Sequence, residues 1–112
     1  MNAPKVPEIT PMALKERLDA GDDVALVDVR EPFEVAIADL PDHGQIRISS
    51  REFASRFTEL DPADEVVIYC RSGARSAQAT QFLLANGFEK VLNLEGGVLA
   101  WREQVDPSLT AY

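Results

Sequence analysis

A single cysteine stands at the head of a short, basic segment that contains one glycine. Cys70 is the only cysteine among the 112 residues, and the residues that follow it are Arg71, Ser72, Gly73, Ala74, Arg75 and Ser76. A thiolate is a strong nucleophile, and nearby positive charge and backbone N–H groups favour it over the thiol. The segment therefore predicts an activated cysteine, where the plainer alternative is an inert cysteine buried in the core.

The elements on either side of this cysteine would position it for chemistry. Residues 65–70 form an apolar, β-branched run that predicts a buried strand, and residues 75–86 have the spacing of a helix that ends at Gly87. In open α/β sheets, ligands bind at the carboxyl ends of the strands, where the start of a following helix presents free N–H groups. Gly73 allows the connecting loop to turn sharply. We therefore expect the loop to favour the Cys70 thiolate and to be able to bind a small anion.

The remaining sequence alternates between strands and helices. Further strands are predicted at residues 24–29, 46–48 and 91–94, and helices are predicted after Thr10, over residues 31–38, after Ser49 and after Gly97. Ser49 and Glu52 have the spacing of a capping box for the third of these helices. The alternation indicates one α/β domain around a mostly parallel sheet. We place this domain at residues 8–112, behind a flexible arm at residues 1–7.

Length, charge and composition exclude several classes of protein. A chain of 112 residues with 46% hydrophobic and 27% charged residues fits one globular domain. The net charge of −8 argues against nucleic-acid binding, and no apolar run predicts a membrane span or an export signal. One cysteine and one histidine exclude an internal disulfide and a Cys-only or His-rich metal site. A free thiol is typical of the reducing cytoplasm, where we expect the protein to work.

Three motifs resemble one family in the same order along the chain. Residues 70–76 resemble the active-site loop of rhodanese-type sulfurtransferases, residues 26–32 (Leu-Val-Asp-Val-Arg-Glu-Pro) resemble a strand motif of that family, and residues 93–101 resemble its C-terminal signature. Together they span most of the chain. The resemblance implies a single rhodanese-like domain of the α/β class, with a mostly parallel five-stranded sheet flanked by helices on both faces.

The resemblance also implies a reaction. Cys70 would take the outer sulfur of thiosulfate or of a protein or cysteine persulfide, hold it as a persulfide, and pass it to a nucleophilic acceptor. The loop residues Arg71, Ser72, Gly73, Ala74, Arg75 and Ser76 would bind the persulfide and the anionic donor. No metal and no organic cofactor is implied.

The end of the chain points to a narrower group. Residues 100–112 are similar to the C-terminus of rhodanese domains fused behind adenylyltransferases that are related to ubiquitin-activating enzymes. Those fusions supply sulfur for molybdopterin, thiamine or tRNA thiolation. The similarity implies a small sulfur-carrier protein or an adenylyltransferase as partner, and it leaves open whether this domain acts alone.

Asp28 and Arg30 lie at the end of the predicted strand at residues 24–29. We expect this strand to lie beside the strand that ends at Cys70. In the functional interpretation they stand behind the active site, and Asp28 braces the loop by accepting its N–H groups or an arginine. In the structural interpretation, Arg30 forms a plain ion pair with Glu31 or Glu34.

Two other functions compete with sulfur transfer. Cell-cycle phosphatases share the fold but need a C-x5-R loop, and the position of that arginine is taken here by Ser76, because Arg75 gives C-x4-R. A regulatory or binding module with a silent site is the other alternative. Such modules usually lack the cysteine, whereas Cys70 is present with its full loop.

Overall fold

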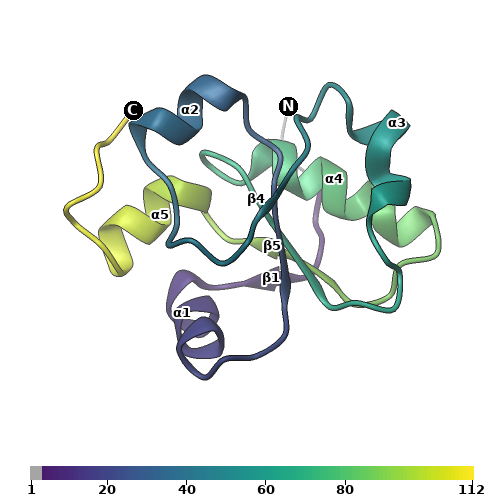
Figure 1. Ribbon diagram of the computed structural model, residues 1–112, viewed down its shortest axis with the longest axis horizontal. Coiled ribbons are helices and arrows are strands. Elements are labelled where there is room, and N and C mark those ends of the chain that lie inside the picture. The colour runs from purple at the N-terminus through teal and green to yellow at the C-terminus, as the bar shows by residue number, and fades with distance from the viewer. Residues whose placement is uncertain (1–3) are drawn as a thin grey trace.

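The computed structural model describes residues 4–112 and contains one parallel sheet of five strands in the order β1-β5-β4-β2-β3 (Figure 1). The strands are β1 (Glu8–Ile9), β2 (Ala25–Asp28), β3 (Ile46–Arg47), β4 (Val66–Tyr69) and β5 (Val91–Leu94). The helices are α1 (Pro11–Asp19), α2 (Pro32–Ile37), α3 (Phe53–Arg56), the 3-10 turn η1 (Phe57–Glu59), α4 (Ala74–Ala85) and α5 (Gly97–Gln104). The predicted α/β class and five-stranded parallel sheet are confirmed.

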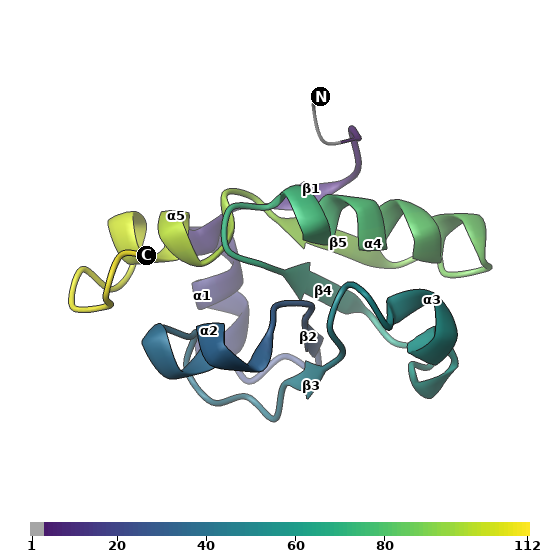
Figure 2. The ribbon, with the colours of Figure 1, turned by 90° about the horizontal axis from the view of Figure 1, so that it is seen from above.

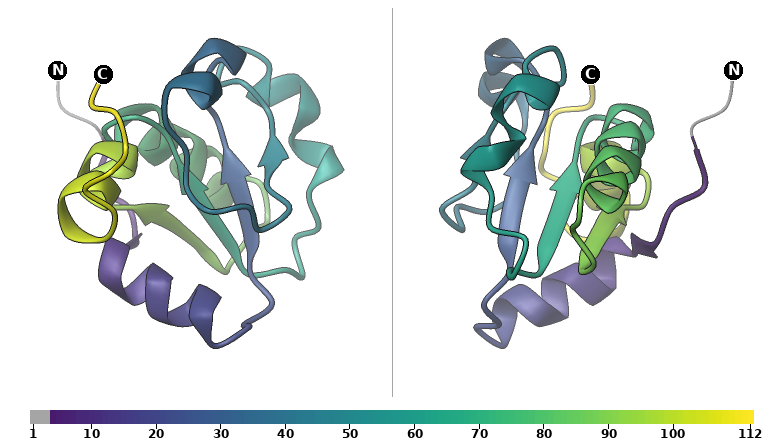
Figure 3. Two further views of the ribbon diagram at one scale, coloured as in Figure 1. Left: turned by 60° about the vertical axis from the view of Figure 1, so that its left-hand side comes forward. Right: turned by 90° about the vertical axis from the view of Figure 1, so that its right-hand side faces the viewer.

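The central strand β4 is buried along its whole length, as expected for a strand with helices on both faces. It pairs with β2 in a register that places Asp28 opposite Tyr69, and with β5 so that Ile68 lies opposite Asn93. Figure 3 shows β2 and β4 side by side and pointing the same way. Because all the strands are parallel, the segments that follow β2, β3 and β4 emerge at one edge of the sheet.

Helices cover both faces of the sheet and enclose two apolar cores (Figure 2). One core lies under α3 and α4 and includes Phe53, Ile68 and Leu83. The other lies under α1 and α5 and includes Leu14 and Trp101. No helix within residues 4–112 has both the length and the apolar character needed to cross a membrane.

The start of the first helix follows the prediction, whereas the start of the third does not. Thr10 caps α1, because its Oγ1 accepts a hydrogen bond of 3.2 Å from the Ala13 N–H. The capping box predicted at Ser49 is wrong, because residues 49–52 form a backbone turn and α3 begins only at Phe53. Ser49 Oγ has no hydrogen-bond partner within residues 4–112. The predicted single helix after it also divides into the short α3 and η1.

The first strand has only two residues and was not located from the sequence. Glu8 and Ile9 pair with Asn93 and Leu94 of β5, and the Pro7 carbonyl accepts a hydrogen bond of 2.9 Å from the Asn93 N–H. Residues 1–3 of the predicted arm lie outside the described residues, and the boundary at residue 8 stays a prediction.

Candidate active site

The chain after β4 turns tightly against the start of α5, and this contact fixes the position of Cys70. The Cys70 carbonyl accepts a hydrogen bond of 3.0 Å from the Val98 N–H. Gly97 makes the approach possible, because a Cβ there would lie 2.5 Å from the carbonyl oxygens of both Cys70 and Arg71. Its φ of +61° also favours glycine. The side chain of Cys70 is thereby held in a buried position, 1% exposed, at the carboxyl end of β4.

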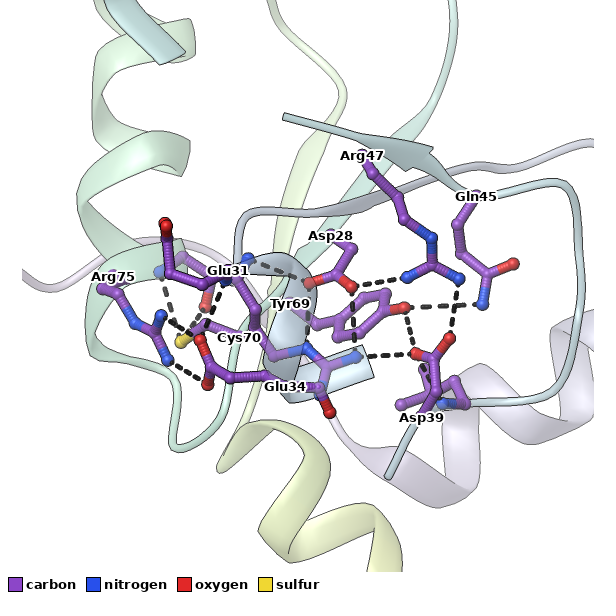
Figure 4. Close-up of polar contacts among 12 residues, drawn as sticks. Asp28, Glu31, Glu34, Asp39, Gln45, Arg47, Tyr69, Cys70 and Arg75 are labelled. Atoms are coloured by element: carbon purple, nitrogen blue, oxygen red, sulfur yellow. Dashed lines mark hydrogen bonds and ion pairs between the residues drawn. The ribbon is translucent and has the colours of Figure 1, made fainter. Parts of the chain in front are cut away.

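The Cys70 sulfur is surrounded by hydrogen-bond donors from the loop (Figure 4). The Gly73 N–H lies 3.1 Å from Sγ and the Ser76 N–H lies 3.5 Å from it. Gly73 has a φ of +102°, and this left-handed conformation directs the chain back toward the sulfur before α4 begins. The first N–H groups of α4 have no acceptor within the helix, so they add to the positive potential at this point. The geometry favours a negatively charged sulfur.

Ser76 adds a hydroxyl to this arrangement, and Asn93 of β5 lies behind it. Ser76 Oγ is 3.3 Å from Cys70 Sγ and 2.5 Å from Asn93 Oδ1. The amide nitrogen of Asn93 lies 3.2 Å from the Gly73 carbonyl oxygen and 3.2 Å from Glu8 Oε2. Asn93 was not among the predicted site residues. The available signal was one polar residue within an otherwise apolar strand, and its side chain is buried at 1% exposure.

Arg75 faces a carboxylate that the sequence analysis had not assigned to the site. Its two terminal nitrogens each donate a hydrogen bond of 2.8 Å to Glu34, on α2. Glu34 also accepts from the Glu31 N–H at 2.9 Å. The hydrogen bonds from Arg75 hold the pKa of Glu34 at about 2, well below its usual range, and those same bonds raise the pKa of Arg75. Of the two arginines predicted to hold an anionic donor, Arg75 is therefore already paired with a carboxylate.

Asp28 lies beside β4 and accepts from arginines, as one form of the prediction has it, but these are Arg30 and Arg47, and its carboxylate does not bond the loop within the described residues. Its carboxylate accepts from the backbone N–H and Nε of Arg30, both at 3.0 Å, and from Arg47 at 2.6 Å. Within residues 4–112, no hydrogen bond joins it to residues 70–76. The register of β2 explains this, because Asp28 lies opposite Tyr69 and its side chain is engaged by two arginines before it can reach the loop.

Arg30 is fully buried and connects its own strand to α2. Its guanidinium donates to the carbonyl oxygens of Glu34, at 3.3 Å, and Ala38, at 2.7 Å. Burial alone would lower the pKa of Arg30, but hydrogen bonds to Asp28 and Tyr112 outweigh it and raise that pKa. Arg30 thus forms neither of the two ion pairs proposed from the sequence. It holds the helix that carries Glu34 toward Arg75.

Tyr112 brings the end of the chain against the same helix and loop. Its hydroxyl lies 3.1 Å from Glu34 Oε1 and accepts a hydrogen bond of 2.9 Å from Arg30. Its carbonyl oxygen accepts from Arg71 Nε, and the Arg71 guanidinium lies 5.3 Å from the centre of the Tyr112 ring. Tyr112 therefore contacts one loop arginine directly and the carboxylate that holds the other. Nothing in its local sequence indicated this role.

The predicted site residues thus divide into four groups. Cys70, Gly73 and Ser76 meet at the sulfur, whereas Arg71 and Arg75 lie on the rim of the site, each with a partner. Ser72 and Ala74 are exposed on the outer side of the loop. Asp28 and Arg30 belong to an ion-pair network with Asp39 and the half-exposed Arg47, away from the sulfur, and Arg30 connects this network to Tyr112 (Figure 4).

Comparison with known proteins places this arrangement among proteins of similar fold and sequence. The model of the family described as "Rhodanese-like domain" matches residues 10–104. A sulfurtransferase of Allochromatium vinosum is 44% identical over 86% of this chain and 88% of its own length. A rhodanese-like domain protein of Staphylococcus aureus has a crystal structure that superposes with a TM-score of 0.79, at 30% identity, over 96% of this chain and 99% of that one.

Two further relatives are longer than this chain. The probable adenylyltransferase/sulfurtransferase MoeZ of Mycobacterium tuberculosis is 34% identical over 98% of this chain, which spans 28% of its length. The putative sulfur carrier protein YrkF of Bacillus subtilis is 37% identical over 89% of this chain, which spans 53% of its length.

Proposed function

Since the chain belongs to the rhodanese-like domain family, we propose that it is a sulfurtransferase that carries sulfane sulfur as a persulfide on Cys70. The observation that carries the proposal is the set of donors around one buried sulfur, from the N–H groups of Gly73 and Ser76. A persulfide is anionic, and fixed donors aimed at the place where negative charge develops are an effective form of catalysis.

The reaction balances without any metal, oxidant or organic cofactor. The Cys70 thiolate attacks the outer sulfur of thiosulfate, a new S–S bond forms, and the old S–S bond breaks with its electron pair leaving on sulfite. The resulting persulfide keeps its negative charge on the terminal sulfur. A nucleophilic acceptor then attacks that sulfur, and the Cys70 thiolate leaves and is regenerated. This is covalent catalysis by one nucleophile in two displacement steps.

The pairing of Arg75 favours donors that carry little net charge. Glu34 neutralises Arg75, and the protein as a whole carries a charge of −8, so a dianion such as thiosulfate approaches against a repulsive field. A persulfide on a protein or on cysteine is less highly charged. We therefore propose a persulfide as the working donor, with thiosulfate as a usable substitute in the laboratory.

The competing functions fit the site less well. A phosphatase of this fold needs an arginine at the position of Ser76, and the Ser76 side chain is instead a buried hydroxyl 3.3 Å from the sulfur. A binding module without catalytic activity would not need a cysteine whose sulfur is surrounded by hydrogen-bond donors. Turnover of an aryl phosphate would favour the phosphatase, and failure of Cys70 to take up sulfur would favour the silent module.

A protein partner is supported by the relatives and by one exposed helix. MoeZ and YrkF pair a region like this chain with further sequence, under names that include adenylyltransferase and sulfur carrier. On α2, Phe33 is 66% exposed and Ile37 is 36% exposed, whereas Glu34 between them faces inward. An exposed aromatic residue beside a reactive site is typical of a protein-contact surface. We propose that a sulfur-carrier protein or an adenylyltransferase contacts α2, in a reducing compartment such as the cytoplasm.

Intact-protein mass spectrometry tests the proposed function. Incubation with thiosulfate or with a cysteine persulfide should add the mass of one sulfur atom to the wild-type protein and none to Cys70→Ser. Removal of the added sulfur by cyanide or a thiol would complete the cycle. An unchanged mass for folded wild-type protein with both donors would reject the proposal.

A further inference from the structure

Asn93 is an unusual residue for its place in the fold, because its amide is buried in β5 directly behind the catalytic loop. Its side chain is 1% exposed and contacts three separate segments: β1 through Glu8, the loop through the Gly73 carbonyl, and α4 through Ser76. A buried amide with three specific partners is costly unless every partner is matched, so its orientation is well defined.

The partners of the amide nitrogen fix which way the group points. The Gly73 carbonyl oxygen and the Glu8 carboxylate, each 3.2 Å away, are acceptors only. They must therefore face the NH₂ group, which leaves Oδ1 facing Ser76. A flipped amide would put its oxygen against two other oxygens.

The single proton of the Ser76 hydroxyl is then used in the hydrogen bond to Asn93. Asn93 Oδ1 carries no hydrogen, so the contact of 2.5 Å requires Ser76 to donate to it. Toward Cys70 Sγ, at 3.3 Å, Ser76 Oγ presents lone pairs and can accept from the thiol. The hydroxyl can donate to an anionic sulfur only by leaving Oδ1 without a partner in a buried place, which costs free energy.

We propose that Asn93 is a positioning residue that withholds the Ser76 hydroxyl from the Cys70 sulfur, so that the backbone N–H groups alone stabilise the anion. The inference rests on the proposed sulfur-transfer function, because that function gives the anionic sulfur its role. The test of the inference does not depend on sulfur transfer. Other charged groups near the sulfur are the Arg75–Glu34 pair from α4 and α2, Arg71 from the loop, and Glu8 from β1. Asn93→Leu and Ser76→Ala leave these charges unchanged, whereas Asn93→Asp adds a carboxylate beside Ser76.

The rate of Cys70 alkylation by iodoacetamide, measured against pH, tests this assignment. Asn93→Leu removes the acceptor and frees the hydroxyl for the sulfur, so the midpoint of the profile should fall by about one pH unit. Asn93→Asp keeps an acceptor for Ser76, so its midpoint should not fall. Ser76→Ala should not raise the midpoint, because the hydroxyl is not the donor to the sulfur in the wild type.

The double variant separates transmission through Ser76 from a general disturbance. In the Ser76→Ala background, Asn93→Leu should leave the midpoint unchanged. A rise of the midpoint in Ser76→Ala, or a shift caused by Asn93→Leu that persists without the hydroxyl, would overturn the proposal. If Asn93→Leu does not fold, Ser76→Ala alone still decides it. Alkylation needs no sulfur donor, so a failed sulfur transfer would not affect this result.

Discussion

Glu34 holds Arg75 through two hydrogen bonds of 2.8 Å, although the two residues are 41 positions apart in the chain. The pair links α2 to the first turn of α4, beside the loop that carries Cys70. It also neutralises one of the two loop arginines, Arg71 and Arg75, that the sequence motif predicts to hold an anionic donor. We expect this ion pair to determine how well the site binds thiosulfate relative to a less highly charged persulfide donor.

Paired substitutions at these two residues separate binding of the donor from shaping of the loop. Arg75→Ala should lower kcat/KM for thiosulfate, by the equivalent of about 1–3 kcal/mol in activation free energy and mostly through KM, because it leaves the Glu34 carboxylate unpaired beside the site, where it repels the anion. Glu34→Gln should lower KM for thiosulfate, because Arg75 is then free to meet the anion. Steady-state kinetics should be run in parallel with a persulfide donor, which carries less negative charge than thiosulfate. Equal losses for both donors in Arg75→Ala would mean that Arg75 only shapes the loop.

The stability of the protein should depend on Glu34 at acidic pH. Its pKa is about 2 in the folded protein, against an ordinary value of 4.5, so the unfolded chain binds more protons between these two values. The stabilising effect of Glu34 is complete above about pH 4.5 and is lost as the pH falls toward 2. Urea unfolding across this window should show a smaller pH dependence for Glu34→Gln than for wild type. The exposed residue Glu103 provides the control, since Glu103→Gln should keep the wild-type slope.

Two glycines of similar backbone conformation test the packing that fixes Cys70. Gly97 has a φ of +61° and Gly44 a φ of +66°, but a Cβ meets two carbonyl oxygens at 2.5 Å only at Gly97 and nothing within 4 Å at Gly44. Gly44→Ala should cost about 1 kcal/mol of unfolding free energy, from conformation alone. Gly97→Ala should cost clearly more and reduce sulfur transfer, because the loop must shift. Equal unfolding midpoints for the two variants would show that the close contact is unimportant.

The exposed residue Phe33 should matter for protein acceptors and not for small ones. Phe33→Ser removes an aromatic side chain that is 66% exposed, so the fold and the transfer from thiosulfate to cyanide should stay near wild type. Transfer to a sulfur-carrier protein should fall several-fold, because hydrophobic contact area at the interface is lost. Met12→Ser on α1, where the side chain is 47% exposed, is the matched control. A Phe33→Ser variant with normal transfer to the carrier would remove α2 from the proposed interface.

The elements that the sequence predicts well are those determined by local patterns. The apolar run before Cys70, Gly73 in the turn and the helix ending at Gly87 each carry their own signal, and the structure places them as expected. The strand β1 is too short to show any periodicity. Ser49 has the spacing of a helix cap, but the backbone turn at residues 49–52 takes precedence.

The parts of the site that the sequence misses depend on contacts between distant segments. Glu34 reaches Arg75 only because α2 packs against the loop, and Tyr112 reaches Glu34 from 78 residues away. Asn93 meets Ser76 because α4, which follows β4, packs on the neighbouring strand β5. Parallel topology brings these residues together, and no local pattern encodes such a meeting. Glu34 is a charged residue on an apolar helix, and Asn93 is an amide in an apolar strand. Each pattern predicts that the side chain has a polar partner, but neither pattern identifies that partner.

Transfer of labelled sulfur tests the central claim most directly. Thiosulfate labelled in its outer sulfur should place the label on the peptide that contains Cys70, and a chase with cyanide or a thiol should move all of it to the acceptor. Cys70→Ser, shown to be folded by circular dichroism, should neither take up nor pass on label. Label that reaches the acceptor without first appearing on Cys70, or that is transferred at the wild-type rate by Cys70→Ser, would contradict the persulfide mechanism.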